Sequence, residues 1–208
     1  EASHHAIDPT DPNTVYSAGF YGRIARSDLD ADKTERLAPK SVDGEPPLRG
    51  QWLAPFIISP HNPRVVYHGM NRLFRSMNVG EDFEPISDDL THADTSTMGD
   101  IPFHTIFTIS ESPLQFGLIY VGTDDGRVQV TEDSGATWRE IGDGTAANRW
   151  ISRVEASRFD LDTVYMAQNG KRHDDFAPYL WKSTDRGETW NSITANIPVG
   201  PINVIRED

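Results

Sequence analysis

The chain has 208 residues and no cysteine, which excludes disulfides, thiolate nucleophiles and zinc–thiolate sites. Its formal net charge of −13 argues against a nucleic-acid partner, because the phosphate backbone attracts basic surfaces. Hydrophobic residues make up 37% of the chain, and no apolar run approaches the about 20 residues of a membrane-spanning helix.

The first predicted unit, residues 1–48, has strand patterns but a degenerate turn. An opening strand is expected in "SHHAIDP", and the marker "DPNTVY" ends at Tyr16. Where later units carry a turn motif, this unit has "SDLDADKT", and we expect a different and looser turn between Ser27 and Thr34. A polar connection containing Gly and Pro leads to the next unit.

The second unit, residues 49–98, repeats the pattern. Its strands are expected in "PFIISP", "VVYHGM", "LFRSM" and "FEPIS", and its marker "NPRVVY" ends at Tyr67. The amide oxygen of Asn78 in "SMNVGEDF" can accept a backbone hydrogen bond, so we expect the unit to keep four strands and the same hairpin. The residues of this worn turn motif are Ser76, Asn78, Gly80 and Phe83.

Clear copies of the turn motif occur in the third unit, residues 99–145, and the fourth, residues 146–198. "TEDSGATW" and "STDRGETW" recur at a spacing of about fifty residues, after markers that end at Tyr120 and Tyr165. Short alternating or β-branched runs, such as "HTIFTIS" and "ISRVEAS", predict four strands in each unit. The motif residues are Thr131, Asp133, Gly135 and Trp138, then Ser183, Asp185, Gly187 and Trp190.

Four short strands in each unit predict the blades of a β-propeller. The sequence "PINVIRED", within residues 199–208, matches the opening strand of earlier units. We therefore expect an all-β propeller segment of about four four-stranded blades, followed by the opening strand of a further blade. Such an arc would belong to a larger propeller, with its end sheets covered by the remaining blades or by a partner chain.

Each position of the turn motif has a physical role in a hairpin between the third and fourth strands. The Asp side chain is expected to accept hydrogen bonds from backbone N–H groups two and three residues on. The Gly supplies a positive φ, and the Trp carries apolar area between neighbouring sheets. The motif is therefore interpreted as structural, not catalytic.

The two clear motifs resemble the Asp-box, or BNR, repeat of sialidases, sortilin-type Vps10 domains and family 74 xyloglucanases. The longer text from "SPHNPRVVYHGMNRLFRSMNVGEDF" to "GPINVIRED" is similar to large secreted bacterial proteins described as sortilin-like or glycosyl-hydrolase-like repeat proteins. The resemblance covers essentially the whole chain. It implies a β-propeller and a secreted, periplasmic or cell-surface location, but no single activity, because the motif occurs in enzymes and non-enzymes.

Loops at one face of the predicted propeller carry the candidate binding surface. Aromatic rings beside arginines and carboxylates suit a carbohydrate or a peptide. The alternative is that Trp52 and Trp150 anchor their loops and that the charges are solvated. The surface comprises Arg49, Trp52, His104, Asp124, Asp125, Trp150, Arg153, His173, Asp174 and Asp175, with Arg149, Arg172 and Tyr179 beside them.

Glycoside hydrolysis would need two carboxylates about 5–10 Å apart. The candidates are Asp124, Asp125, Glu155, Asp174 and Asp175. None of them matches the catalytic pair of family 74, and the Arg cluster, Tyr and Glu of a sialidase are not found. No catalytic residue is assigned.

No metal or cofactor is predicted. Asp28, Asp30 and Asp32 alternate like calcium ligands, but Lys33 and Pro39 stand where an EF-hand needs Gly and Glu. The histidine pair at positions 4 and 5 is interpreted as a terminal or strand-edge pair, and "HDDF" offers too short a loop for a complete site.

The sequence thus predicts a non-catalytic binding or scaffold module of a large exported protein, which contacts a protein partner or a polysaccharide through its loop face. Two alternatives stay open: a glycoside hydrolase of the xyloglucanase type, and a structural subunit of an extracellular assembly.

Overall fold

A computed structural model describes residues 4–41, 44–99 and 102–208. The fold is all-β, with four antiparallel sheets of four strands each, and every sheet is built from strands that are consecutive in the chain. The predicted fold class is confirmed. Within the described residues no helix has the length and apolar character needed to cross a membrane.

The strands of one sheet, here called a blade, fall within each predicted unit. Blade one contains β1 (His5–Asp8), β2 (Asp11–Ala18), β3 (Ile24–Asp28) and β4 (Lys33–Leu37), with the short 3-10 turn η1 (Phe20–Gly22). Blade two contains β5 (Phe56–Ile58), β6 (Val66–Gly69), β7 (Leu73–Ser76) and β8 (Glu84–Pro85). Blade three contains β9 (Ile106–Glu111), β10 (Ile119–Thr123), β11 (Val128–Thr131) and β12 (Arg139–Glu140). Blade four contains β13 (Trp150–Ala156), β14 (Val164–Asn169), β15 (Tyr179–Ser183) and β16 (Asn191–Ser192), with the 3-10 turn η2 (Lys171–His173).

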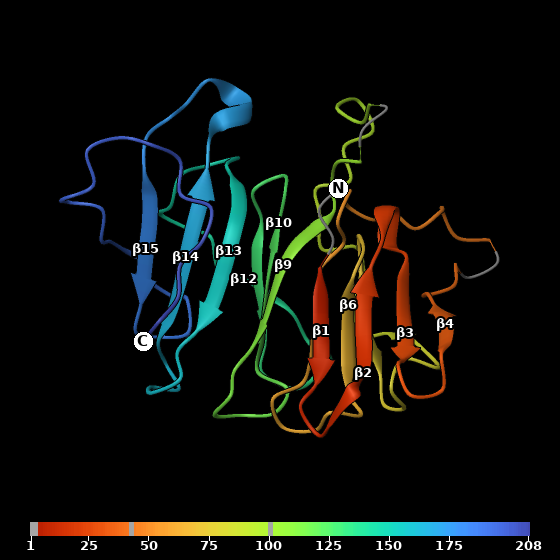
Figure 1. Ribbon diagram of the computed structural model, residues 1–208. Coiled ribbons are helices and arrows are strands. Elements are labelled where there is room, and N and C mark those ends of the chain that lie inside the picture. The colour runs from red at the N-terminus through yellow and green to blue at the C-terminus, as the bar shows by residue number, and fades with distance from the viewer. Residues whose placement is uncertain (1–3, 42–43, 100–101) are drawn as a thin grey trace.

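The blades form an open arc and do not close into a ring (Figure 1). Neighbouring opening strands are joined by side chains as well as by packing. The Thr108 hydroxyl of β9 accepts a hydrogen bond from the Val154 N–H of β13 at 3.3 Å, and the Ser110 hydroxyl accepts one from the Ala156 N–H at 3.0 Å. The arc is therefore held together along its inner strands.

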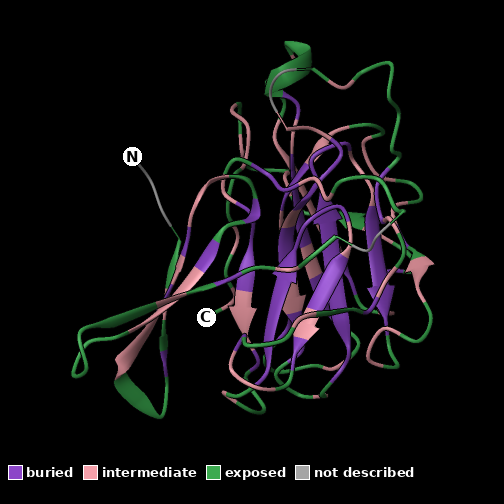
Figure 2. Ribbon diagram, turned by 90° about the vertical axis from the view of Figure 1, so that its right-hand side faces the viewer, coloured by how far each residue is buried: buried purple, intermediate pink, exposed green. Residues whose placement is uncertain are grey.

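Clusters of buried hydrophobic side chains fill the spaces between adjacent blades. Figure 2 shows buried residues concentrated in the central strands, while strands of blade one carry many exposed and half-buried residues. Two close approaches between blades lie two residues after the marker tyrosines Tyr67 and Tyr120. There Gly69 lies against Ile106 of the next blade, and Gly122 lies against Ile151. A small residue at this position lets successive blades pack tightly.

The turn motif of blade three is held by its own side chains. The Thr131 hydroxyl accepts a hydrogen bond from Gly135 N–H at 2.8 Å, and Asp133 accepts bonds from the N–H and the hydroxyl of Thr137 at 2.8 and 2.7 Å. The expected acceptance from N–H groups two and three residues on is thus wrong, because Ser134 (φ 62°) and Gly135 (φ 97°) turn the chain back over the carboxylate. Blade four repeats all three bonds.

The tryptophans of the motif connect blades as expected. The Trp138 indole N–H donates to the Ile86 carbonyl of blade two at 2.9 Å, and its ring packs on the core between blades two and three. Trp190 donates in the same way to the Ile141 carbonyl of blade three. The motif therefore fastens each blade to its predecessor.

Blade two keeps this hairpin, as predicted. Asn78 accepts a hydrogen bond from Asp82 N–H at 3.1 Å, the Ser76 hydroxyl accepts one from Gly80 N–H at 2.9 Å, and Phe83 packs against the buried cores.

The turn of blade one differs, but it is not looser. There Asp28 accepts bonds from Asp30 and Ala31 N–H at 3.0 and 2.9 Å, and the strands pair as far as Asp28 and Lys33. The expected loose turn is wrong because this Asp side chain closes a tight hairpin.

Residues 201–208 form no strand, although an opening strand was expected there. Among the described residues no neighbouring strand pairs with them. The segment nevertheless lies along blade four: Ser152 donates to the Ile202 carbonyl at 2.7 Å, and Tyr165 donates to Glu207 at 3.0 Å. The latter contact matches the bond from Tyr67 to Glu111 of the following opening strand, at 2.9 Å. Residues 201–208 thus occupy the place of an opening strand.

Candidate functional site

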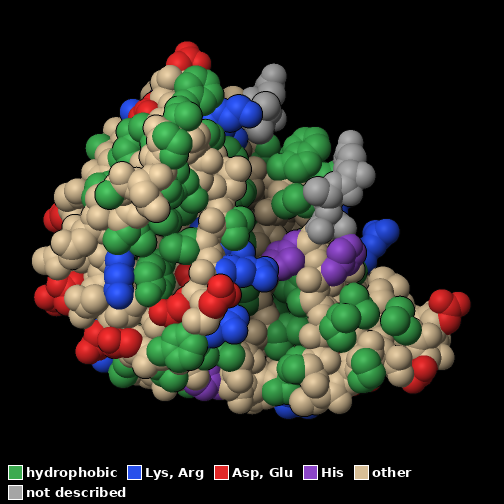
Figure 3. All heavy atoms as spheres, turned by 60° about the vertical axis from the view of Figure 1, so that its left-hand side comes forward, with side chains coloured by type: hydrophobic (Ala, Val, Ile, Leu, Met, Phe, Trp, Pro, Cys, Tyr) green, Lys and Arg blue, Asp and Glu red, His purple; other side chains and the backbone are tan. Residues whose placement is uncertain are grey.

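A groove of about 720 Å³ lies on the inner side of the arc. Side chains of the opening strands β5, β9 and β13 and of the segment 203–206 line it. Figure 3 shows one face of the molecule hollowed between two lobes, with Lys or Arg and His side chains beside the hollow. The lining combines aromatic rings, amides, hydroxyls and arginines: His4, Leu53, Pro55, Phe56, Ile57, Phe107, Thr108, Ile109, Trp150, Ser152, Arg153, Asn169, Asn203, Val204 and Arg206.

Trp150 at the start of β13 is the central aromatic residue of the groove. Its ring meets Phe107 of β9 edge-on at 4.6 Å between centroids, and the Arg172 guanidinium lies 4.0 Å from its centroid. The loop between β14 and β15 supplies Arg172, which also lies 5.3 Å from the Phe103 ring. Trp150 is therefore fixed between two blades and a loop, while its indole N–H has no partner in the described part of the chain.

The charged side chains that line the groove are basic. Arg153 of β13 and Arg206 line it together with His4, and among the described residues no Asp or Glu does. Burial, helped by Arg153 and by the neighbouring His5, lowers the pKa of His4. Within the described residues neither arginine forms an ion pair or a side-chain hydrogen bond, and the Arg153 Nε atom is buried without an acceptor.

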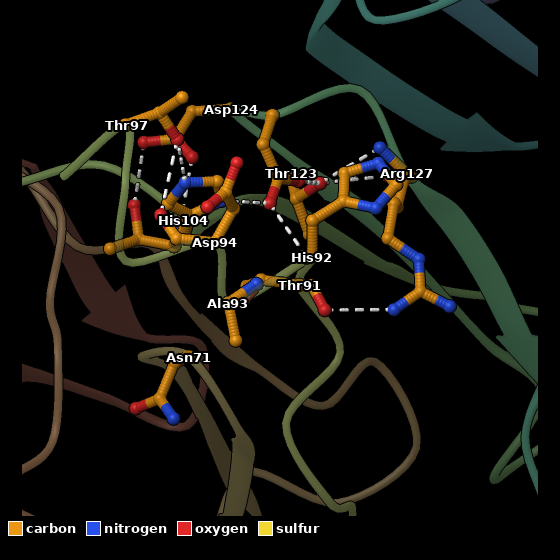
Figure 4. A network of polar contacts seen from close by, with 12 residues as sticks. Asn71, Thr91, His92, Ala93, Asp94, Thr97, His104, Thr123, Asp124 and Arg127 are labelled. Carbon is orange, nitrogen blue, oxygen red and sulfur yellow. Dashed lines mark hydrogen bonds and ion pairs between the residues drawn. The ribbon is translucent and has the colours of Figure 1, made fainter. Parts of the chain in front are cut away.

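A second cluster is a buried polar network between blades two and three (Figure 4). His104 is 3% exposed, and its Nδ1–H donates to Asp125 at 2.6 Å while Nε2 lies 2.7 Å from the Thr97 hydroxyl. Asp125 also accepts hydrogen bonds from the Thr123 hydroxyl and, at 2.8 Å, from the His92 N–H. The network fixes the loop 91–105 onto the β10–β11 turn.

Asp124 joins three segments of the chain. It accepts hydrogen bonds from the Gln51 amide at 2.6 Å and from the N–H and hydroxyl of Thr105, both at 2.9 Å. Burial is the main cause that raises the pKa of Asp124 to about 6, and Asp125 adds to the shift, while Thr105 and Arg172 oppose it. Because Asp124 is only 3% exposed, we interpret it as a buried structural residue that holds these segments together.

The predicted binding residues do not form one surface. Trp150 and Arg153 lie in the groove, whereas His104, Asp124 and Asp125 are buried, which corrects their expected place on a surface. They are buried because loops from several units converge on them. The other predicted binding residues lie at separate places on the molecule.

The dispersed members make contacts of their own. Arg49 pairs with Asp89 at 2.6 Å. Trp52 is 44% exposed and stacks on Phe20 at 4.7 Å between centroids. Asp175 pairs with Arg149 at 2.8 Å and accepts a hydrogen bond from Tyr179 at 2.7 Å. His173 and Asp174 lie exposed at η2.

The structure does not place a carboxylate pair in the groove. Asp124 and Asp125 are enclosed by hydrogen-bond donors, and Asp175 is held by Arg149. Burial raises the pKa of Glu155, which is half-buried on β13 and is not a lining residue. The described residues contain no group of three or more His, Asp or Glu arranged to hold a metal ion.

Several groove residues were missed by sequence reasoning. Phe107, Asn169, Asn203 and Arg206 come from strands and from the terminal segment, not from the loops that were considered. The available signal was the alternation of the opening strands, since Ile106 is buried against the preceding blade and Phe107 points to the other face. That second face forms the wall of the groove.

No family model matches the chain, and no curated protein matches it. Solved structures do match its fold. The GH74 xyloglucanase from Xanthomonas campestris superimposes with a TM-score of 0.66 at 21% identity, over 94% of this chain and 31% of the enzyme. Saccharomyces cerevisiae Sqt1 gives a TM-score of 0.64 at 14% identity, over 92% of this chain and 48% of that protein. An auxiliary nutrient binding protein from Bacteroides thetaiotaomicron gives a TM-score of 0.57 at 9% identity, over 90% of this chain and 40% of that protein.

This chain spans less than half the length of each of these proteins. At such low identity the likeness concerns the fold alone. It identifies the four blades as a β-propeller-type segment.

Proposed function

We propose that this chain is a non-catalytic binding module of an exported protein and that it holds a polysaccharide in the groove on the inner side of the arc. The observation that carries the proposal is the lining of the groove. It offers aromatic rings for stacking and amide and hydroxyl groups for hydrogen bonds, and its described residues include no carboxylate to act as acid, base or nucleophile.

The structural neighbours support the choice of a polysaccharide. One is a xyloglucanase and another is a nutrient binding protein, so related folds serve both hydrolysis and binding. A hydrolase of the xyloglucanase type is the second candidate, favoured by the fold likeness. Its carboxylates would have to come from outside the groove lining, since Asp124 and Asp125 are already engaged as hydrogen-bond acceptors.

Replacing Trp150 with alanine is expected to weaken polysaccharide binding by about thirtyfold, because a tryptophan at the centre of a binding site typically contributes about 2 kcal/mol. Binding is measured by calorimetry against a panel of soluble plant and bacterial polysaccharides, and turnover by the release of reducing ends. Trp150→Phe, which keeps an aromatic ring, should retain part of the affinity.

Asp133→Ala serves as the matched control, because the Asp133 carboxylate holds a turn outside the groove. It should lower Tm by roughly 2–4 °C while leaving the affinity unchanged. Hydrolysis of a bound polysaccharide by the wild-type chain would reject the non-catalytic module in favour of the enzyme. Binding to none of the polysaccharides would reject the module altogether.

A further inference from the structure

The groove carries an unbalanced positive charge in an acidic chain. The chain as a whole has a net charge of −13, yet the charged groups that line the groove among the described residues are Arg153 and Arg206. Several arginines elsewhere on the arc form ion pairs, as Arg26 does with Glu35 and Arg186 with Asp162. The groove arginines lack such partners among the described residues, so their charge is available to a ligand.

Two buried donors on the wall of the groove also have no hydrogen-bond acceptor within the described part of the chain. The Nε atom of Arg153 and the indole N–H of Trp150 are buried donors without a hydrogen-bond partner in the described residues. Buried donors are normally satisfied, and an unsatisfied one costs about 1–3 kcal/mol. Both residues lie on β13, which forms part of the groove wall. A ligand that supplies oxygen acceptors could therefore satisfy both donors.

Glu155 is one acidic residue to consider as an internal partner of the groove arginines. It follows Arg153 by two positions on β13, and Arg153 and Arg206 favour its charged form while burial disfavours it. It forms no ion pair with either arginine within 4.0 Å and does not line the groove. Both arginines of the groove are therefore left without a direct ion-pair partner among the described residues.

We propose that the groove selects an acidic polysaccharide, whose carboxylate or sulfate groups pair with Arg153 and Arg206 while its sugar rings contact Trp150 and Phe107. The proposal rests on the proposed function and adds the charge of the ligand. Arginine forms paired hydrogen bonds with the oxygens of such anionic groups, and Asn169 and Asn203 can bond to sugar hydroxyls. A polysaccharide is favoured over an acidic peptide because the neutral lining groups are amides and hydroxyls suited to many sugar hydroxyls.

The test compares four probes by calorimetry: oligogalacturonate for carboxylates, sulfated dextran oligosaccharide for sulfates, xyloglucan oligosaccharide as the neutral sugar, and oligoglutamate as an acidic peptide. We expect one of the two acidic sugars to bind at least about tenfold more tightly than the neutral sugar. The stronger of the two identifies the anionic group. Raising the salt concentration should reduce this preference, because added ions screen partly exposed charges.

Arg153→Gln and Arg206→Gln are each expected to reduce the affinity for the acidic sugar by about tenfold and to leave the affinity for the neutral sugar nearly unchanged. Arg64→Gln is the matched control: it makes the same charge change on an exposed residue outside the groove, and it should have no effect. Arg153→Lys keeps the charge and should retain most of the preference, and thermal unfolding checks that each variant is folded.

Two outcomes would overturn the proposal while leaving the binding module intact. One is equal affinity for neutral and acidic sugars with no effect of the arginine variants. The other is tighter binding of oligoglutamate than of any sugar, which would assign the groove to an acidic peptide. Failure of every sugar to bind, by contrast, would remove the proposed function itself.

Discussion

Replacing Gly122 with alanine is expected to lower the free energy of unfolding by about 3 kcal/mol, the upper end of the usual cost of overpacking a core. Gly122 lies in β10, at a close approach between blades three and four. An added Cβ would come within 2.3 Å of Cγ2 and 2.7 Å of Cβ of Ile151, and this Cβ cannot move without shifting β13. Urea unfolding followed by tryptophan fluorescence measures the change.

Two further variants make this result specific. Gly99→Ala is the control, because an added Cβ there would meet no atom of the described residues within 4 Å, and it should leave stability unchanged. Ile151→Ala removes Cγ2, the atom nearest to the added Cβ, so the double variant should lose less stability than the two single variants summed. Additive losses would contradict the account of tight packing between these blades.

Stability between pH 4 and 6.5 is expected to reflect two buried groups that act in opposite directions. Complete burial lowers the pKa of His68 from 6.5 to about 4. Its contribution to stability is therefore full above pH 6.5 and is lost as the pH falls toward 4. Burial raises the pKa of Asp124 from 3.8 to about 6. Its contribution is full below pH 3.8 and is lost as the pH rises through 6. Each amounts to about 3 kcal/mol.

Removing one group should expose the effect of the other. His68→Gln keeps an N–H that can donate to the Gly22 carbonyl, as the His68 ring does at 2.9 Å. This variant should lose about 3 kcal/mol between pH 4 and 6.5 as the pH rises, because Asp124 then titrates alone. Asp124→Asn should gain a similar amount over the same range. Urea unfolding at several pH values measures both profiles, and two profiles parallel to that of the wild type would contradict these assignments.

The strands and turns could be predicted from the sequence because they depend on local patterns. Alternation, the marker tyrosines and the spaced Gly residues lie within each unit, and the hairpin of Asp133 needs only its near neighbours. The particular donor to Asp133 could not be predicted, since it depends on the left-handed backbone at Ser134.

The site was harder to predict because it depends on contacts between units. Asp124 resembles an exposed loop carboxylate in the sequence, and only the approach of Gln51, 73 residues away, makes it an interior group. In the same way Arg153 and Arg206 meet in one groove only because the terminal segment lies along blade four. Contacts between residues so far apart in the chain produce no periodic pattern in a single sequence.

Whether the groove on the inner side of the arc holds the ligand can be measured with the indole N–H signals in an NMR spectrum. The chain has five tryptophans, and Trp150→Phe identifies the signal of Trp150. Addition of oligogalacturonate, or of the sulfated sugar if that binds more tightly, should shift the Trp150 signal and leave the signals of Trp138 and Trp190 in place, because those indoles are bonded to the preceding blade. A shift at exposed Trp52 with none at Trp150 would place the ligand on the loop face and contradict the account.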